Sequence, residues 1–279
     1  MFKNVKFSPL NIETLCKYID LIIKRKITGI YNLGSKNGFS KAKFALKFAR
    51  KLNLPIIVDL IFGLPGESVK SFLRTISKLA SLGVEKHSIY QLRMLPSTAL
   101  DDTLRDQYSM KTLSRPFNNR YGEYSFLSKD KPVRVIEKED IVVESNSFTF
   151  DGFLEMRLYG LLCELFIGYG AFSDTIIFLS TRNIPLENIL TEIINESNTD
   201  IKIKNMFIDY TAMIKNELFE SEDEMHSHLS ADTEWNDLIN GSGNFFKINI
   251  GFSGYCLLKD IEILEFFKSI IVKKAKTIL

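Results

Sequence analysis

Three cysteines offer the most versatile chemistry in this sequence, because a thiolate can bind a metal, form a disulfide or attack a substrate. Cys16, Cys163 and Cys256 are separated by 147 and 93 residues and flank apolar positions. This spacing predicts neither a disulfide framework nor a local metal knuckle. Free thiols fit a reducing compartment, and the start "MFKNVKFSPL" lacks the apolar centre of an export signal. We therefore expect a cytoplasmic protein.

Two histidines, His226 and His228, lie beside several carboxylates and could bind a metal if a rigid scaffold held both rings on one face. The surrounding segment, 220–244, is acidic and rich in turn-forming residues. We interpret it as an exposed loop or linker. His87 follows a lysine at the start of an apolar run and is predicted at the surface.

Two further patterns are too weak to predict a site. "GLPGES" at 63–68 lacks the lysine and the spacing of a phosphate-binding loop. Tyr255 and Lys259 have the spacing of a catalytic tyrosine–lysine pair, but the sequence contains no glycine fingerprint for a dinucleotide.

Charge is distributed unevenly along the 279 residues. Residues 1–54 contain 12 Lys or Arg and two acidic residues, so they carry +10, whereas the remainder carries −8. A basic patch can bind phosphates, but we favour two pieces of different origin and predict no nucleic-acid partner. The apolar run 158–179 contains Glu164 and Asp174, so we expect a buried helix or helix pair there and no membrane association.

The elements that must position these residues follow from periodicity and capping. Asn11 is expected to cap a first helix with apolar residues at helical spacing. A short strand, "TGIYNLG", and a helix, "KAKFALKFARKL", capped by Ser40, are expected next. From Pro55 onward "IIVDLIFG" reads as a buried parallel strand, and Ser68 caps a helix. "HSIYQLRML" then returns as a strand, which gives one βαβ unit.

Beyond Pro96 the pattern is less regular. We expect a polar stretch over 101–131 and strands at "PVRVIEK" and "DIVVES". Helices are predicted from about Phe153 to Leu218 and from about Lys259 to Ala275.

Residues 7–55 resemble the C-terminal part of dTDP-4-dehydrorhamnose reductases, in "FSPLNIETLCKYIDLIIKRKITGIYNLGSKNGFSKAKFALKFARKLNLP". In that family the segment helps to build the sugar-nucleotide side of the cleft. The cofactor fingerprint and the catalytic pair lie upstream of the resembling segment.

Residues 56–100, "IIVDLIFGLPGESVKSFLRTISKLASLGVEKHSIYQLRMLPSTAL", resemble strand five, its helix and strand six of a radical S-adenosylmethionine barrel. Residues 105–162 further resemble the region after the barrel in the class with a cobalamin-binding domain. The resemblance implies S-adenosylmethionine, a [4Fe–4S] cluster and cobalamin as cofactors.

Carried over by position, the resemblance implies that Asp59 reaches the ribose of S-adenosylmethionine and that Arg93 offers its backbone to the adenine. Ile61 and Gly63 would line the same edge. Within this chain alone we favour a simpler role for Asp59, a carboxylate that caps the turn after its strand.

The family holds its cluster through Cys-x-x-x-Cys-x-x-Cys, a motif that these 279 residues do not contain. We therefore expect none of the three cofactors to be bound by this chain alone. The expected fold is α/β, a partial (β/α) barrel fragment of one βαβ unit with a mainly helical C-terminal region. Its expected segments are 1–54, 55–104 and 105–279.

The leading hypothesis is a truncated or fused reading frame, in which a reductase-like tail is joined near Pro55 to part of a radical S-adenosylmethionine protein. Such a chain should catalyse neither family's reaction on its own. Its partner would be the missing half of the barrel. The alternatives are a non-catalytic interaction subunit that docks through the exposed barrel edge, and a remnant of a dTDP-sugar reductase that binds through Lys41 and Lys43.

Overall fold

The computed structural model of the chain divides into two compact units, Met1–Ile56 and Ile57–Leu279. The division lies close to Pro55, where the charge of the sequence changes sign. The structure describes residues 6–7, 11–29, 39–40, 44, 47, 51–52, 57–84, 86–125, 132–240 and 248–277.

The first unit contains helix α1 (Ile12–Lys24) and a short antiparallel pair, β1 (Lys6–Phe7) with β2 (Phe39–Ser40). The predicted cap is confirmed, because the Asn11 side chain accepts a hydrogen bond from the Thr14 amide at 2.8 Å. The predicted strand at 28–34 and the predicted helix at 41–52, with Lys41 and Lys43, lie largely outside the described residues.

The second unit begins with the predicted βαβ unit, which is confirmed. Strands β3 (Ile57–Phe62) and β4 (Lys86–Gln91) are parallel, and helix α3 (Val69–Ser81) connects them. Ser68 and Ser71 form a reciprocal capping box at the start of α3, which satisfies two backbone amides there.

The two faces of this small sheet have different environments. Residues that are adjacent in a strand point to opposite faces. On one face Phe62 and Ile89 are buried with Phe72 and Ile76 of α3 in the main core. On the other face the strands present Ile57, Asp59, Ile61 and Tyr90, all exposed.

The two predicted strands, at 132–138 and 140–145, form one continuous strand of a long hairpin. Strand β6 (Lys111–Tyr124) pairs antiparallel with β7 (Val133–Glu144), and the short β5 (Arg93–Met94) adds to β7. The polar stretch expected over 101–131 contains strand β6, which was not predicted because its outer part has few apolar residues. Before β6 the chain forms a short π-helix, η1 (Leu100–Leu104), and helix α4 (Arg105–Gln107).

The region from residue 150 onward is mainly helical, as predicted, and supplies most of the core. The apolar run forms α5, a π turn and α6, which pack inside the unit and confirm a buried helix pair. The helical segments are α5 (Phe150–Cys163), η3 (Glu164–Gly168), α6 (Ser173–Thr181), α7 (Leu186–Glu196), η4 (Ser197–Thr199), α8 (Ile201–Asn216), α11 (Ile248–Leu258) and α12 (Ile261–Ala275).

Membrane crossing was tested by helix length and composition. Among the described residues, no single helix is both long and apolar enough to cross a bilayer. The two segments Phe150–Gly168 and Ser173–Thr181 reach that length and apolar composition only when they are taken together, and they are bent by 101° relative to each other.

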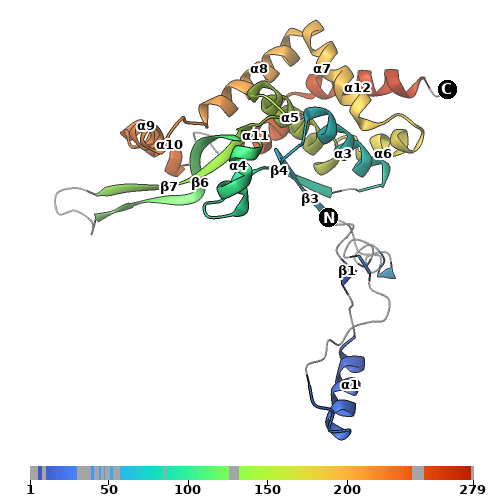
Figure 1. The fold of residues 1–279 in the computed structure, drawn as a ribbon. Helices are drawn as coiled ribbons and strands as arrows, with labels where there is room; N and C mark the ends of the chain where they lie inside the picture. Colours follow the sequence, from blue (N-terminus) through green and yellow to red (C-terminus); the bar gives the residue numbers. More distant parts are fainter. Residues whose placement is uncertain are drawn as a thin grey trace. The chain divides into compact units, whose positions relative to one another are not determined.

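The prediction of an exposed loop at 220–244 was wrong for residues 222–240. Helices α9 (Glu222–Leu229) and α10 (Asp232–Asn240) fold there and lie beside the β6–β7 hairpin (Figure 1). The few apolar residues that these two helices bury are enough to cover one face, because they pack into a single small cluster. That satellite core contains Ile136, Phe219, Met225, Leu229, Trp235 and Leu238.

Candidate polar site beside the exposed sheet face

The four residues that the sequence implied for a cofactor site are neighbours along β3 to β5. Asp59 and Ile61 share the exposed face of β3, and Gly63 is buried immediately after its carboxyl end. Arg93 lies in β5, where it is the register partner of Ile141 in β7. The side chains of Asp59 and Ile61 are therefore accessible to a ligand. The Arg93 backbone instead lies in the antiparallel pair of β5 with β7.

The turn after β3 is closed by Glu67. Its carboxylate accepts a hydrogen bond from the Gly63 amide at 2.8 Å, and burial raises the pKa of Glu67. Among the described residues the Asp59 side chain makes no hydrogen bond or ion pair, so the predicted capping role for Asp59 was wrong. Gly63 has φ +91°, a conformation that favours glycine at this turn.

The Arg93 side chain begins a chain of alternating charges. Its Nη1 atom lies 2.9 Å from Glu139 Oε2, and Arg115 Nε donates to Glu139 Oε1 at 2.6 Å. Arg115 Nη1 and Arg157 Nη1 then approach the same oxygen, Oε1 of Glu217, at 3.2 and 2.9 Å. We call this series of three arginines and two glutamates the charge ladder.

The charge ladder lines a pocket of about 540 Å³. Strand β4 supplies its wall from Ser88 to Gln91, so the pocket borders the exposed face of the sheet. Phe117 lies under the Arg93 guanidinium, 5.4 Å from the ring centre, and Tyr169 is a further aromatic lining residue.

A second polar network enters the same pocket from α8 and α11. Tyr210 donates to Asn249 Oδ1 at 2.7 Å, and Asn249 Nδ2 donates to Glu164 Oε2 at 2.8 Å. Burial raises the pKa of Glu164 and raises the pKa of Tyr210 to about 12. Both groups are therefore held towards their uncharged forms.

One donor in this pocket lacks a partner. The Nε atom of Arg157 is buried and makes no hydrogen bond within the described part of the chain. Leaving such a donor unsatisfied costs about 1–3 kcal/mol of folding free energy.

The prediction that His87 lies at the surface was wrong. His87 is 8% exposed, and its Nε2 atom lies 3.0 Å from Cys163 Sγ in the core. Burial lowers the pKa of His87 and raises the pKa of Cys163. These directions favour a neutral pair and not the thiolate that nucleophilic chemistry requires.

The other two cysteines have separate environments. Cys16 is exposed in the first unit. Cys256 is buried beside the Met206 sulfur at 3.6 Å, and burial raises the pKa of Cys256 to about 11. No group of three or more metal-ligating side chains occurs among the residues that the structure describes.

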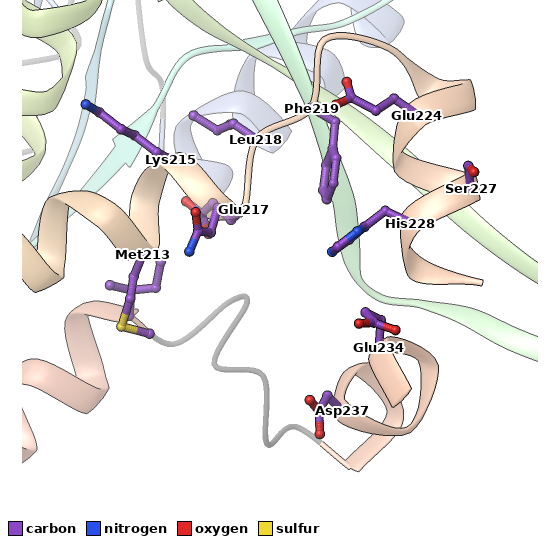
Figure 2. Close-up of a pocket in the computed structure, with 12 residues that line it drawn as sticks. Met213, Lys215, Glu217, Leu218, Phe219, Glu224, Ser227, His228, Glu234 and Asp237 are labelled. Atoms are coloured by element: carbon purple, nitrogen blue, oxygen red, sulfur yellow. The ribbon is translucent and has the colours of Figure 1, made fainter. Parts of the chain in front are cut away.

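A larger pocket, about 870 Å³, lies between the end of α8 and helices α9 and α10. Figure 2 shows His228 beside Phe219 on one wall, and their ring centres are 5.6 Å apart. His226 instead lies 3.8 Å from Glu222, one helical turn before it. Positions two apart on a helix diverge, which removes the basis for joint metal binding by His226 and His228.

Comparison with known proteins adds no relative. No family model matches this sequence, and no curated protein matches it.

Sequence reasoning found Arg93 but missed the other members of the charge ladder. The bonded pairs are separated by 24, 60 and 102 residues along the chain, in Arg115–Glu139, Arg157–Glu217 and Arg115–Glu217. The one available signal is Arg157, a charged residue of α5 directly between the apolar residues Met156 and Leu158.

Proposed function

We propose that this chain contains one βαβ unit of a radical S-adenosylmethionine barrel, from the class with a cobalamin-binding domain. The supporting observation is the asymmetry of the β3–β4 sheet. Helix α3 lies on one face, and apolar side chains are exposed on the other, including Ile57, Ile61 and Tyr90.

A closed (β/α) barrel explains this asymmetry. Its helices cover the outside of the strands, and the opposite face of every strand points into the barrel. In the proposed barrel Asp59 and Ile61 face the interior, and Gly63 lies at the carboxyl end of strand β3. Carboxyl ends of barrel strands are where active sites form, so this is the edge at which the proposed barrel would bind S-adenosylmethionine.

The cysteines of this chain do not fit an iron–sulfur cluster. Cluster ligands are thiolates, whereas burial raises the pKa of both Cys163 and Cys256. Cys163 also packs against His87, and Cys16 belongs to the other unit. We therefore propose no reaction for this chain alone, and any radical chemistry would require cluster and cobalamin sites from a partner.

Anaerobic reconstitution tests this proposal. The purified chain is incubated with iron, sulfide and S-adenosylmethionine, and bound iron and 5′-deoxyadenosine are measured. We expect no cluster absorption and no cleavage. A stable cluster with S-adenosylmethionine cleavage, lost in Cys163→Ser or Cys256→Ser, would overturn the claim that this chain is inactive alone.

A second candidate function is a non-catalytic subunit that docks through the barrel edge. It is favoured by the edge of β3 away from β4, which pairs with no strand among the described residues. A partner that supplies neighbouring strands should slow amide exchange at 57–62. Unchanged exchange in a complex that forms stably would exclude docking at this edge.

A further inference from the structure

We propose that helix α1 lies on the surface of an anionic lipid bilayer, with its apolar face in the lipid. The proposal rests on the first unit alone, so it stands or fails independently of the barrel proposal. The expectation of no membrane association came from the apolar run 158–179, which is a different part of the chain.

The first argument is the uncovered apolar face of α1. Side chains three and four positions apart on a helix share a face. One half of α1 is therefore apolar, and its members are Ile12, Leu15, Cys16, Ile19, Ile22 and Ile23. None of the residues of α1, which the structure describes in full, is buried, and Ile12, Ile19 and Ile23 are 76%, 44% and 68% exposed. This face therefore remains in contact with water.

An apolar face of this kind indicates an interaction surface. Contiguous exposed apolar side chains are unfavourable in water and commonly mark the place where a partner or a membrane binds. The opposite half of α1 is polar and includes Glu13, Lys17, Asp20 and Lys24. This division into an apolar and a charged half is typical of helices that lie in the plane of a membrane surface.

The second argument is charge, which selects the partner. Residues 1–54 carry +10 and contain only two acidic residues. Lys24, Arg25 and Lys26 follow one another at the carboxyl end of α1. Anionic lipid headgroups attract such basic segments, and the attraction adds to the gain from burying the apolar face.

The same two features disfavour other partners. A second copy of the chain would bring two units of like charge together, which costs electrostatic free energy. Nucleic acid would neutralise the basic side chains, but its phosphate backbone offers no apolar surface for the isoleucines of α1. An anionic bilayer satisfies both the charge and the apolar face.

Cys16 provides a probe of this contact within the chain itself. It is exposed and belongs to the apolar face, one helical turn after Ile12, whereas Cys163 and Cys256 are buried. Lipid that covers the face should therefore shield the Cys16 thiol from a charged, water-soluble thiol reagent.

Binding is tested with vesicles of phosphatidylcholine alone and of equimolar phosphatidylcholine and phosphatidylserine. Co-sedimentation of the full chain and the rate of Cys16 modification are measured on the same samples. We expect binding to the vesicles that contain phosphatidylserine and little binding to the others. Bound chain should react several-fold more slowly at Cys16, and added salt should weaken the binding.

One variant tests the apolar face. Ile23→Ser removes an exposed apolar side chain and should weaken binding to the anionic vesicles about tenfold. Ile261→Ser is the matched control, because Ile261 is 71% exposed on α12 in the second unit and should leave binding unchanged.

A second variant tests the charge. Replacing both Arg25 and Lys26 with Gln should weaken binding to the anionic vesicles about tenfold. The control replaces Lys111 and Lys268 with Gln, which removes the same charge from exposed positions in the second unit. This control should bind as the wild type does.

The proposal is overturned if the chain does not sediment with the phosphatidylserine vesicles. It is also overturned if the chain binds them but Cys16 reacts at its unbound rate, because charge alone would then hold the chain to the surface. Self-association that Ile23→Ser abolishes, without binding to lipid, would overturn it by assigning the face to a second copy. Should Ile23→Ser unfold α1, the Cys16 rate in the wild type still decides the result.

Discussion

Arg157 and Glu217 form an ion pair inside the second unit, with 2.9 Å between Nη1 and Oε1 and side chains only 5% and 2% exposed. The pair joins α5 to the residue that follows α8. It is the most deeply buried step of the charge ladder and connects segments that are 60 residues apart.

Glu217→Ala should strongly destabilise the chain. It would leave Arg157 without its carboxylate and remove one of two partners of Arg115. Breaking a buried pair in this way costs about 3–5 kcal/mol of unfolding free energy. Urea denaturation measures the loss, and Glu265→Ala, in an exposed pair with Lys268, should change little. Equal losses in the two variants would show that the buried pair has no special weight.

Trp235→Ala tests the satellite core that replaced the predicted acidic loop. Trp235 is 2% exposed, meets Tyr121 edge-on at 6.5 Å and lies beneath Arg134. Truncating it should cost about 3–5 kcal/mol, whereas truncation of its exposed neighbour Asn236 should be nearly neutral. Trp235 is the single tryptophan of the chain, so circular dichroism is the suitable readout. A stable Trp235→Ala variant would support the original loop interpretation.

His87 should make stability fall in mild acid. Burial lowers the pKa of His87 in the folded state, so the unfolded chain binds the proton first as pH decreases. Its neutral form supports the fold above about pH 6.5, and that support is lost as pH falls from there towards the lower folded-state pKa. His87→Leu should therefore lose less stability than the wild type between neutral pH and about pH 5.5.

Denaturation at the two pH values measures this difference. His226→Gln is the matched control, because it removes a histidine whose side chain is not buried in the main core. The account of His87 fails if His87→Leu and the wild type lose the same stability on acidification.

Gly63→Ala tests the turn after β3. At φ +91° an alanine is strained, and its Cβ would lie 3.4 Å from Leu92 Cβ. We expect a loss of about 1–2 kcal/mol. Gly254→Ala is the control, because that helical position has open space and should gain about 0.5–1 kcal/mol. A neutral Gly63→Ala variant would show that the turn tolerates another conformation.

Local patterns in the sequence predicted the parts of the fold that local physics determines. Asn11 and Ser68 begin helices because their side chains satisfy backbone amides within three residues. The βαβ unit could be predicted because β3 is nearly continuously apolar and α3 has apolar residues at helical spacing. A hairpin with polar outer residues carries no such signal, so β6 was missed.

Tertiary contacts determined the rest. Helices α9 and α10 have mostly polar sequences, and their four buried residues gain a core only by meeting Ile136 and Phe219. His87 is buried because α5 and η3 pack beside β4, a contact that its neighbours in sequence do not predict. The charge ladder is likewise invisible before folding, because its members come from separate strands and helices.

We propose that the face of the β3–β4 sheet opposite α3 would line the interior of a barrel and is uncovered in this chain. Thiol labelling tests this most directly. In a Cys16→Ser background, single cysteines are placed at Ile61 and Tyr90 on that face and at Leu60 and Ile89 on the face towards α3. The native chain is then treated with a maleimide reagent. Cys163 and Cys256 are buried and should react slowly.

The claim predicts that Ile61→Cys and Tyr90→Cys react much faster than Leu60→Cys and Ile89→Cys. Equal protection of Ile61→Cys and Ile89→Cys in the folded chain would contradict it, because both faces of the sheet would then be covered.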